Sequence, residues 1–109
     1  AEEHRFGIHG GEIETSMMLH LAPELVNMEL AGCFHSTSQD RAQHFSILGN
    51  GKSAKMGWAM EDYNSCGAVG NAAGATAAKG QAVVAAAGQQ LALLLQEIHQ
   101  LEWRPAVAG

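Results

Sequence analysis

The sequence has no long hydrophobic run and few basic residues, and each shortage excludes a class of protein. Because no run of about 18 apolar residues occurs, we expect no membrane-spanning helix. The six Lys and Arg residues are scattered singly in a chain of net charge −5, so we expect no nucleic-acid partner. No basic segment is followed by an apolar one, as in a secretion signal, so we expect a cytoplasmic protein.

The sequence also has little cysteine. Cys33 and Cys66 stand alone, without the Cys-x-x-Cys spacing that is typical of zinc sites and redox motifs. We therefore expect two buried, reduced thiols rather than a disulfide or a metal site.

The remaining composition is that of one globular domain. The chain has 109 residues, of which 47% are hydrophobic, and its mean hydropathy is −0.05, so it is long enough for a single core. The i+4 spacing of Ile13, Met17 and Leu21 predicts a helix over residues 11–22, which Pro23 ends.

The middle of the chain is polar and contains turn residues. Residues 32–42 are predicted to be a loop, and residues 61–65 are predicted to be another. Residues 43–48 and 55–59 could form two short strands, with a tight turn at residues 49–51 between them.

A long helix is predicted over residues 73–101, with Asn71 as its cap. Its apolar positions alternate four and three residues apart, a spacing that forms one seam along a partner surface. The seam consists of Gly80, Val84, Ala87, Leu91, Leu94, Ile98 and Leu101.

The segment His9-Gly-Gly-Glu-Ile-Glu-Thr-Ser16 is the main candidate for chemistry. It places an imidazole and a carboxylate, His9 and Glu12, three positions apart around two glycines that allow close backbone approach. From spacing alone, Glu12 is either part of a half-site or a carboxylate that only caps the helix amides. One histidine and one or two carboxylates are too few to hold a catalytic metal, so the rest of such a site must come from elsewhere.

Other motifs are weaker. Gly51-Lys52-Ser53 is similar to the end of a phosphate-binding loop, but Ser46 stands where that motif needs glycine. The six histidines show no His-x-x-x-His spacing, so a histidine-rich metal carrier is the least favoured of three candidate functions.

Two segments resemble the creatininase (creatinine amidohydrolase) family. Residues 9–26 are similar to its His-(Ala/Gly)-Gly-Glu-x-Glu-Thr-Ser segment, and residues 57–80 are similar to its closing segment, where Ala-Thr-x-x-Lys-Gly leads into the last helix. The resemblance implies an α/β fold, namely the C-terminal part of a three-layer αβα domain with a mainly parallel sheet. On this basis residues 1–109 are expected to be one portion of that single domain, without its N-terminal half.

The resemblance also implies a function. Family members are metal-dependent hydrolases of non-peptide amide or formamide C–N bonds and commonly form hexamers. It implies Glu12 as a ligand of a two-metal centre (Zn, Mn or Fe) and His9 as the group that transfers a proton or holds the reacting carbonyl. Glu14, Thr15 and Ser16 are implied as supporting residues. Glu12 favours formamidopyrimidines or other small amides over creatinine as substrate.

The sequence departs from the family pattern in its ligand segments and, with an effect expected only on helix capping, at Asn71. The segments Glu-x-His-Gly and Asn-Gly-His-Gly-Gly-Asn, which carry the family's other ligands, do not occur, and Asn71 stands where Asp is common. The expected partner is therefore a missing N-terminal half or chain, and this chain alone is expected to be inactive. The alternative is a non-catalytic assembly subunit, or a truncated fragment, that lacks the ligands and keeps the oligomer-forming surface.

Overall fold

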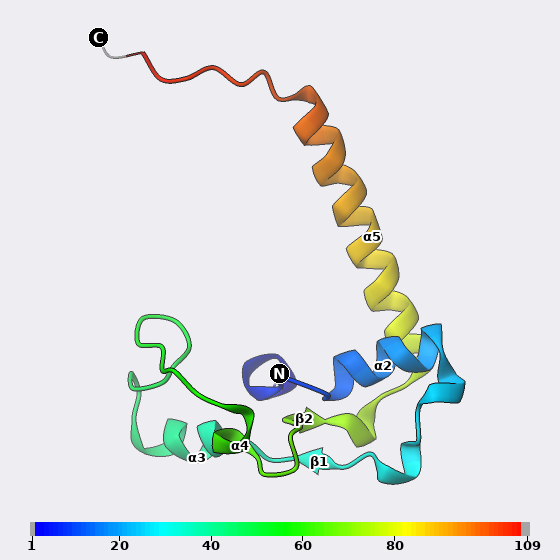
Figure 1. The fold of residues 1–109 in the computed structure, drawn as a ribbon, viewed down its shortest axis with the longest axis vertical. Coiled ribbons are helices and arrows are strands. Elements are labelled where there is room, and N and C mark those ends of the chain that lie inside the picture. The colour runs from blue at the N-terminus through cyan, green and yellow to red at the C-terminus, as the bar shows by residue number, and fades with distance from the viewer. Residues whose placement is uncertain (1, 108–109) are drawn as a thin grey trace.

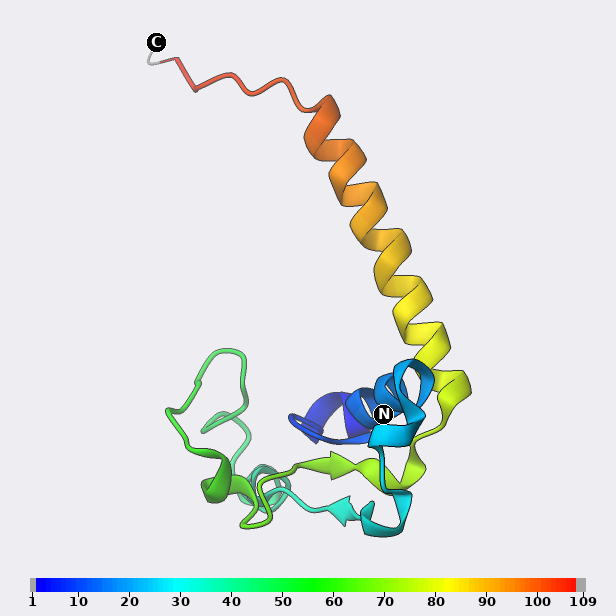
Figure 2. The ribbon, with the colours of Figure 1, turned by 45° about the vertical axis from the view of Figure 1, so that its right-hand side comes forward.

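The computed structural model describes residues 2–107, which form a small mixed α/β body from which one long helix projects (Figures 1 and 2). Its radius of gyration is 18.5 Å, whereas a globular domain of this length would have about 13 Å. Every residue from 85 to 107 is exposed. The distal part of the long helix therefore adds nothing to the core of this chain.

The elements follow one another in a simple order. The helices are α1 (Glu2–Phe6), α2 (Glu12–Leu21), α3 (Thr37–His44), α4 (Met60–Tyr63) and α5 (Ala77–Gln100), with 3-10 turns η1 (Pro23–Leu25), η2 (Met28–Leu30) and η3 (Ala72–Gly74) and strands β1 (Cys33–Phe34) and β2 (Gly70–Asn71). Among these described helices, none is long and apolar enough to cross a membrane.

The sheet has two strands in the described part of the chain. β1 and β2 pair antiparallel, with Cys33 opposite Asn71 and Phe34 opposite Gly70. An antiparallel bridge between His9 and Val69 continues the pairing toward α2. The α/β class is as predicted, whereas residues 2–107 do not themselves form a three-layer arrangement or a parallel sheet.

The two main helices were predicted with different accuracy. α2 is confirmed, and Pro23 opens η1 directly after it. α5 begins four residues later than predicted, because Thr76 caps it by accepting a hydrogen bond from the Lys79 amide at 3.2 Å. The prediction of Asn71 as the cap was therefore wrong.

The middle of the chain differs most from the prediction. Residues 37–44 are helical rather than loop, because Ser36 and Gln39 form a capping box at their start. Residues 43–48 and 55–59 form no strands, although Gly49 and Gly51 do make a turn with φ of 70° and 73°. Residues 60–63 form α4, where a loop was predicted.

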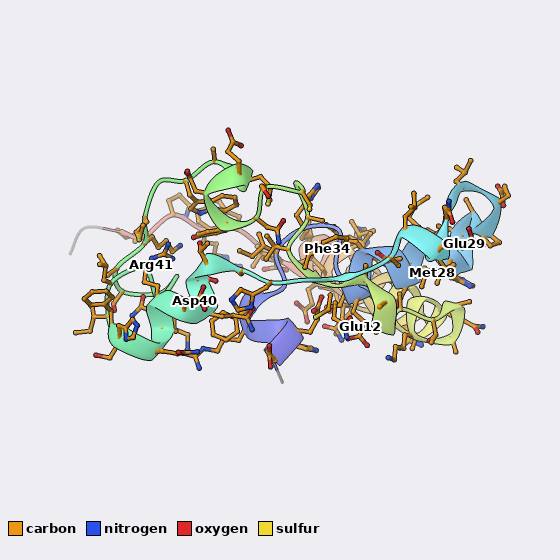
Figure 3. The ribbon with its side chains drawn as sticks, turned by 90° about the horizontal axis from the view of Figure 1, so that it is seen from below. Glu12, Met28, Glu29, Phe34, Asp40 and Arg41 are labelled. Atoms are coloured by element: carbon orange, nitrogen blue, oxygen red, sulfur yellow. The ribbon has the colours of Figure 1, made fainter. Side chains whose placement is uncertain are left out.

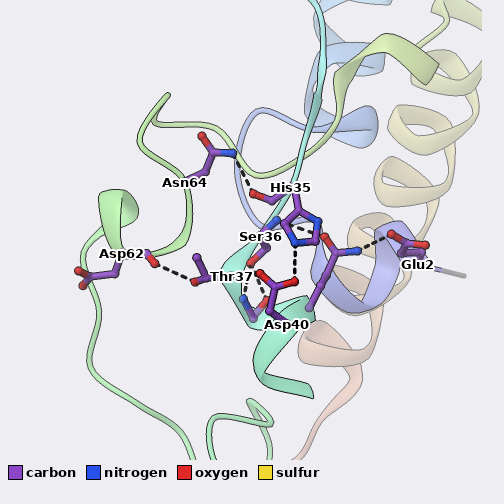
Figure 4. A network of polar contacts seen from close by, with 9 residues as sticks. Glu2, His35, Ser36, Thr37, Asp40, Asp62 and Asn64 are labelled. Atoms are coloured by element: carbon purple, nitrogen blue, oxygen red, sulfur yellow. Dashed lines mark hydrogen bonds and ion pairs between the residues drawn. The ribbon is translucent and has the colours of Figure 1, made fainter. Parts of the chain in front are cut away.

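Polar contacts tie α3 to its neighbours (Figure 4). The Thr37 hydroxyl donates to the carbonyl of Asp62 at 2.8 Å, and the Asn64 amide donates to the carbonyl of His35 at 2.8 Å. The Gln39 side chain donates to the carboxylate of Glu2 on α1. These contacts hold α1, α3 and α4 together where few apolar side chains are buried.

The cysteines are free, as predicted, but the prediction that they are buried was wrong. Cys33 and Cys66 are both exposed. Cys33 lies in the short strand β1, and Cys66 lies in a turn after α4 that covers no core.

The crossing of α2 and α5 is the tightest contact of the fold. A Cβ atom added to Gly80 would lie 1.8 Å from the carbonyl oxygen of Ser16. Ser16 is completely buried, and its hydroxyl accepts a hydrogen bond from the Thr76 amide at 3.1 Å. Only glycine therefore allows α5 to cross α2 at this distance.

Substitution of Gly80 tests this crossing. We expect Gly80→Ala to lower the free energy of unfolding by about 1–3 kcal/mol, because the new methyl group overlaps backbone that cannot move without separating the helices. The matched control is Gly88→Ala in the same helix, where an added Cβ meets nothing within 4 Å. The control should raise stability by about 0.5–1 kcal/mol through helix propensity. Urea unfolding followed by circular dichroism measures both, and a gain in both variants would contradict the close crossing.

Candidate functional site

His9 is fixed through its backbone. Its amide donates to the carbonyl of Val69 at 3.2 Å, and the Val69 amide donates back to the His9 carbonyl at 2.8 Å. Val69 is completely buried. Gly10 then turns the chain with a φ of 64°, so that α2 begins two residues later. The imidazole thus stands at the entry to α2, on backbone that the core holds in place.

Glu14 lies beside this imidazole. Its carboxylate accepts a hydrogen bond from the Gly10 amide, and its Oε2 lies 3.7 Å from His9 Nδ1. The Thr15 hydroxyl donates to the Gly10 carbonyl at 3.4 Å. Both side chains bind the turn directly after His9. His9 and Glu14 remain accessible, with 61% and 50% of their side chains exposed.

Glu12 points to a different neighbour. Its carboxylate forms an ion pair with Nζ of Lys79 in the first turn of α5, and Figure 3 shows it beside that helix. Lys79 Nζ also donates to the carbonyl of Gly74 at 2.8 Å. Glu12 is the less exposed partner, at 25% against 53% for Lys79. Its charge is therefore balanced by an ammonium group from this same chain.

Glu3 joins the three segments of the site, and sequence reasoning missed it. One carboxylate oxygen accepts from the Glu12 amide at 2.8 Å and the other from the Asn71 amide at 2.9 Å. Gly11, which precedes α2, has no side chain to cap the helix, so Glu3 supplies the missing acceptor from α1. No local pattern signals this contact, because the two bonds span nine and 68 residues.

Gly11 of the motif makes the close backbone approach that was expected of it, against Gly70 of β2. A Cβ on Gly11 would lie 3.0 Å from Gly70 Cα and 2.3 Å from Glu3 Oε1, and one on Gly70 would lie 2.7 Å from Gly11 Cα. The backbones of α2 and β2 and the Glu3 carboxylate therefore meet with no room for another side chain.

The structure brings some of the predicted residues together and not others. His9, Glu14 and Thr15 gather around Gly10, whereas Glu12 turns toward Lys79. Ser16 lies in the interface with α5, where its hydroxyl binds the Thr76 amide. Sequence reasoning did not assign Lys79 to the site. The one signal that could have done so is its place in the Ala-Thr-x-x-Lys-Gly segment, which leads into the last helix.

The side chains around His9 and Glu12 do not by themselves form a metal-binding site. Within residues 2–107, no group of three or more His, Cys, Asp or Glu side chains could hold a metal ion. Glu12 is already paired with a cation, and His9 faces Glu14 rather than Glu12. A metal at this site would need ligands from another polypeptide segment.

Comparison with known proteins gives one consistent result. Residues 1–95 match the family described as creatininase, creatinine amidohydrolase. A solved crystal structure, of a "putative creatinine amidohydrolase" from Bacteroides fragilis, is 35% identical and superposes with a TM-score of 0.70. The match covers 92% of this chain and 38% of that one. No curated protein matches the sequence.

These matches first define the class of protein. The chain shares its fold with part of a larger creatininase-like protein. The family match includes both segments that carried the resemblance, residues 9–26 and 57–80. The chain belongs to the creatininase family, and it spans less than half the length of the solved relative.

Removal of the Glu3 carboxylate tests its role in building the site. We expect Glu3→Gln to destabilise the chain by about 1–3 kcal/mol, because the glutamine amide has one acceptor oxygen for two part-buried backbone donors. Glu24→Gln is the control, since Glu24 is exposed in η1. Thermal unfolding of both variants gives the comparison, and equal melting temperatures would show that Glu3 does not cap α2.

Proposed function

We propose that this chain supplies part of the active site of an amidohydrolase that cleaves a non-peptide amide or formamide C–N bond, in a cyclic or an open-chain substrate. The observation that carries the proposal is the His9–Glu14 pair, held at the entry to α2 in a chain of the creatininase family. Together with a partner that provides the N-terminal half, the complete domain would be the three-layer αβα fold. Its assembly would be a cytoplasmic homo-oligomer, a hexamer by family resemblance.

The proposal gives this chain's residues separate tasks. His9 is the proton-transfer group, since Glu14 faces its Nδ1 and leaves Nε2 as the nitrogen directed to other partners. Thr15 and Glu14 hold the Gly10 turn, so the backbone next to the imidazole keeps one conformation. Ser16 affects the site only indirectly, because its hydroxyl binds the Thr76 amide and so positions α2 against α5.

Metal dependence is the further part of the proposal. Two divalent ions (Zn, Mn or Fe) would be held mainly by the partner segment, with Glu12 as the ligand from this chain. Since Lys79 now pairs with Glu12, the ammonium group would have to leave the carboxylate before it could bind a metal.

Two substitutions test the proposal in the natively purified assembly. With added Mn²⁺ or Zn²⁺ and a panel of small amides, including creatinine and a formamidopyrimidine, we expect His9→Asn to slow hydrolysis by about 10²–10⁴-fold without loss of metal. Glu12→Gln should lower both the metal content, measured by mass spectrometry, and the rate. Glu24→Gln should change neither.

Two results would count against this function. Metal content that is unchanged in Glu12→Gln would remove Glu12 from the ligands. If intact-mass analysis finds no second polypeptide, and the chain neither binds metal nor hydrolyses any of the amides, the chain in this form is not an enzyme.

The second candidate is a non-catalytic assembly subunit, and the exposed apolar surface favours it. Nineteen large hydrophobic side chains are exposed, whereas only Tyr63, Val69, Ala72 and Ala75 are buried among the apolar residues described. Soluble chains rarely leave so much apolar surface uncovered. On this reading, sedimentation would show a stable oligomer that forms without metal and hydrolyses no amide. A chain that sediments as a monomer at micromolar concentration would rule it out.

A further inference from the structure

A cavity of about 950 Å³ lies between α1 and the loop that joins α3 to α4. The loop curls beside the N-terminal helix, well away from α5 (Figure 1). Cavities of about 300–1,000 Å³ are the size that small-molecule ligands occupy. Neither the family motif nor the proposed hydrolase uses this cavity.

The charge of the cavity is opposite to that of the chain. Arg5, Lys52 and Lys55 line it together with His4, and no Asp or Glu does. The whole chain has six Lys and Arg against eleven Asp and Glu. The ion pairs formed within residues 2–107 involve other residues, so these three cations have no carboxylate partner there. An anion that entered the cavity would meet these three cations and no carboxylate among the lining residues.

A fourth positive charge lies behind the cavity wall. The guanidinium carbon of Arg41 is 5.7 Å from the ring centre of Tyr63, which lines the cavity. Its Nη1 atom is buried and has no hydrogen-bond partner within residues 2–107. Figure 3 shows Arg41 on α3, far from Glu12.

The wall also offers a flat aromatic surface. Trp58 stacks on Tyr63, with ring centres 4.7 Å apart and planes inclined by 27°. Tyr63 is only 7% exposed, whereas Trp58 is 44% exposed. Trp58 is therefore held against Tyr63 and still exposes aromatic surface on which a planar ring could stack.

The loop that carries the lysines is held in shape by its own contacts. Asn50 Oδ1 accepts hydrogen bonds from the amides of Lys52 at 2.8 Å and Ala54 at 3.1 Å. Gly49 packs so closely on Met56 that an added Cβ would lie 2.7 Å from its Sδ atom. A ligand would therefore meet a loop that is already ordered, which lowers the entropic cost of binding.

We propose that this cavity binds a planar aromatic molecule that carries at least two negative charges, as a phosphorylated nucleoside does. The ring would stack on the free face of Trp58, and the anionic group would lie among Arg5, Lys52 and Lys55. The proposal is independent of amide hydrolysis and needs no partner segment.

The test uses the 109-residue chain with Trp103→Phe, which leaves Trp58 as the one tryptophan. Adenosine monophosphate should quench the Trp58 fluorescence saturably, since it has both a ring and a dianion. Adenosine, which lacks the charge, should bind at least tenfold more weakly, and inorganic phosphate, which lacks the ring, should not quench. Raising NaCl from about 50 to 500 mM should weaken the binding of adenosine monophosphate, because the contact is ionic.

Charge variants identify the site. In the same background, Lys52→Gln with Lys55→Gln should weaken the binding of adenosine monophosphate at least tenfold. Arg104→Gln, which removes an exposed positive charge in the C-terminal tail, should leave it within twofold. Equal affinity for adenosine and its monophosphate, an unchanged affinity in the double lysine variant, or the absence of saturable quenching would each overturn the proposal.

Discussion

The contact between Gly80 and the backbone of Ser16 is the constraint on which the rest of this structure depends. It fixes the distance and the point at which α5 crosses α2. Thr76, one turn earlier, then reaches the Ser16 hydroxyl, and Lys79 reaches the Glu12 carboxylate. A chain with so few buried apolar side chains cannot rely on a large hydrophobic core to set these distances. A steric fit between two backbones and a few hydrogen bonds set them instead.

Glu3 acts on the opposite side of α2 in a comparable way. Its carboxylate accepts hydrogen bonds from one backbone amide of α2 and one of β2. At this place Gly11 and Gly70 pack so closely that no other side chain would fit. The His9 motif is therefore held from two directions, by α1 at the start of α2 and by α5 along its length. This explains how the backbone at His9 is held in place although two consecutive glycines follow it.

Sequence reasoning succeeded where a signal is local and failed where it is not. The apolar spacing predicted α2 and most of α5, and Gly49 and Gly51 predicted a turn. Ser36 and Gln39 form a capping box that was readable in the sequence, but the surrounding polar residues favoured a loop. Of the site, the motif drew attention to His9 and Glu12 as the chemical groups, and the structure places Glu14 rather than Glu12 beside His9. The motif could not predict the pairing of Glu12 with Lys79, 67 residues away, or the role of Glu3, because such contacts depend on the tertiary fold.

The exposed half of α5 has a consequence for how this chain associates. Residues 85–100 have no buried member, so their helical state owes little to tertiary packing. They consist mainly of Ala, Leu and Gln, which have high intrinsic helix propensity. A partner that covers this face would meet a helix that is already formed, and its backbone would lose little conformational entropy on association. For any partner that covered it, the affinity would depend on how well that surface fits the leucines of α5 rather than on folding of the segment upon contact.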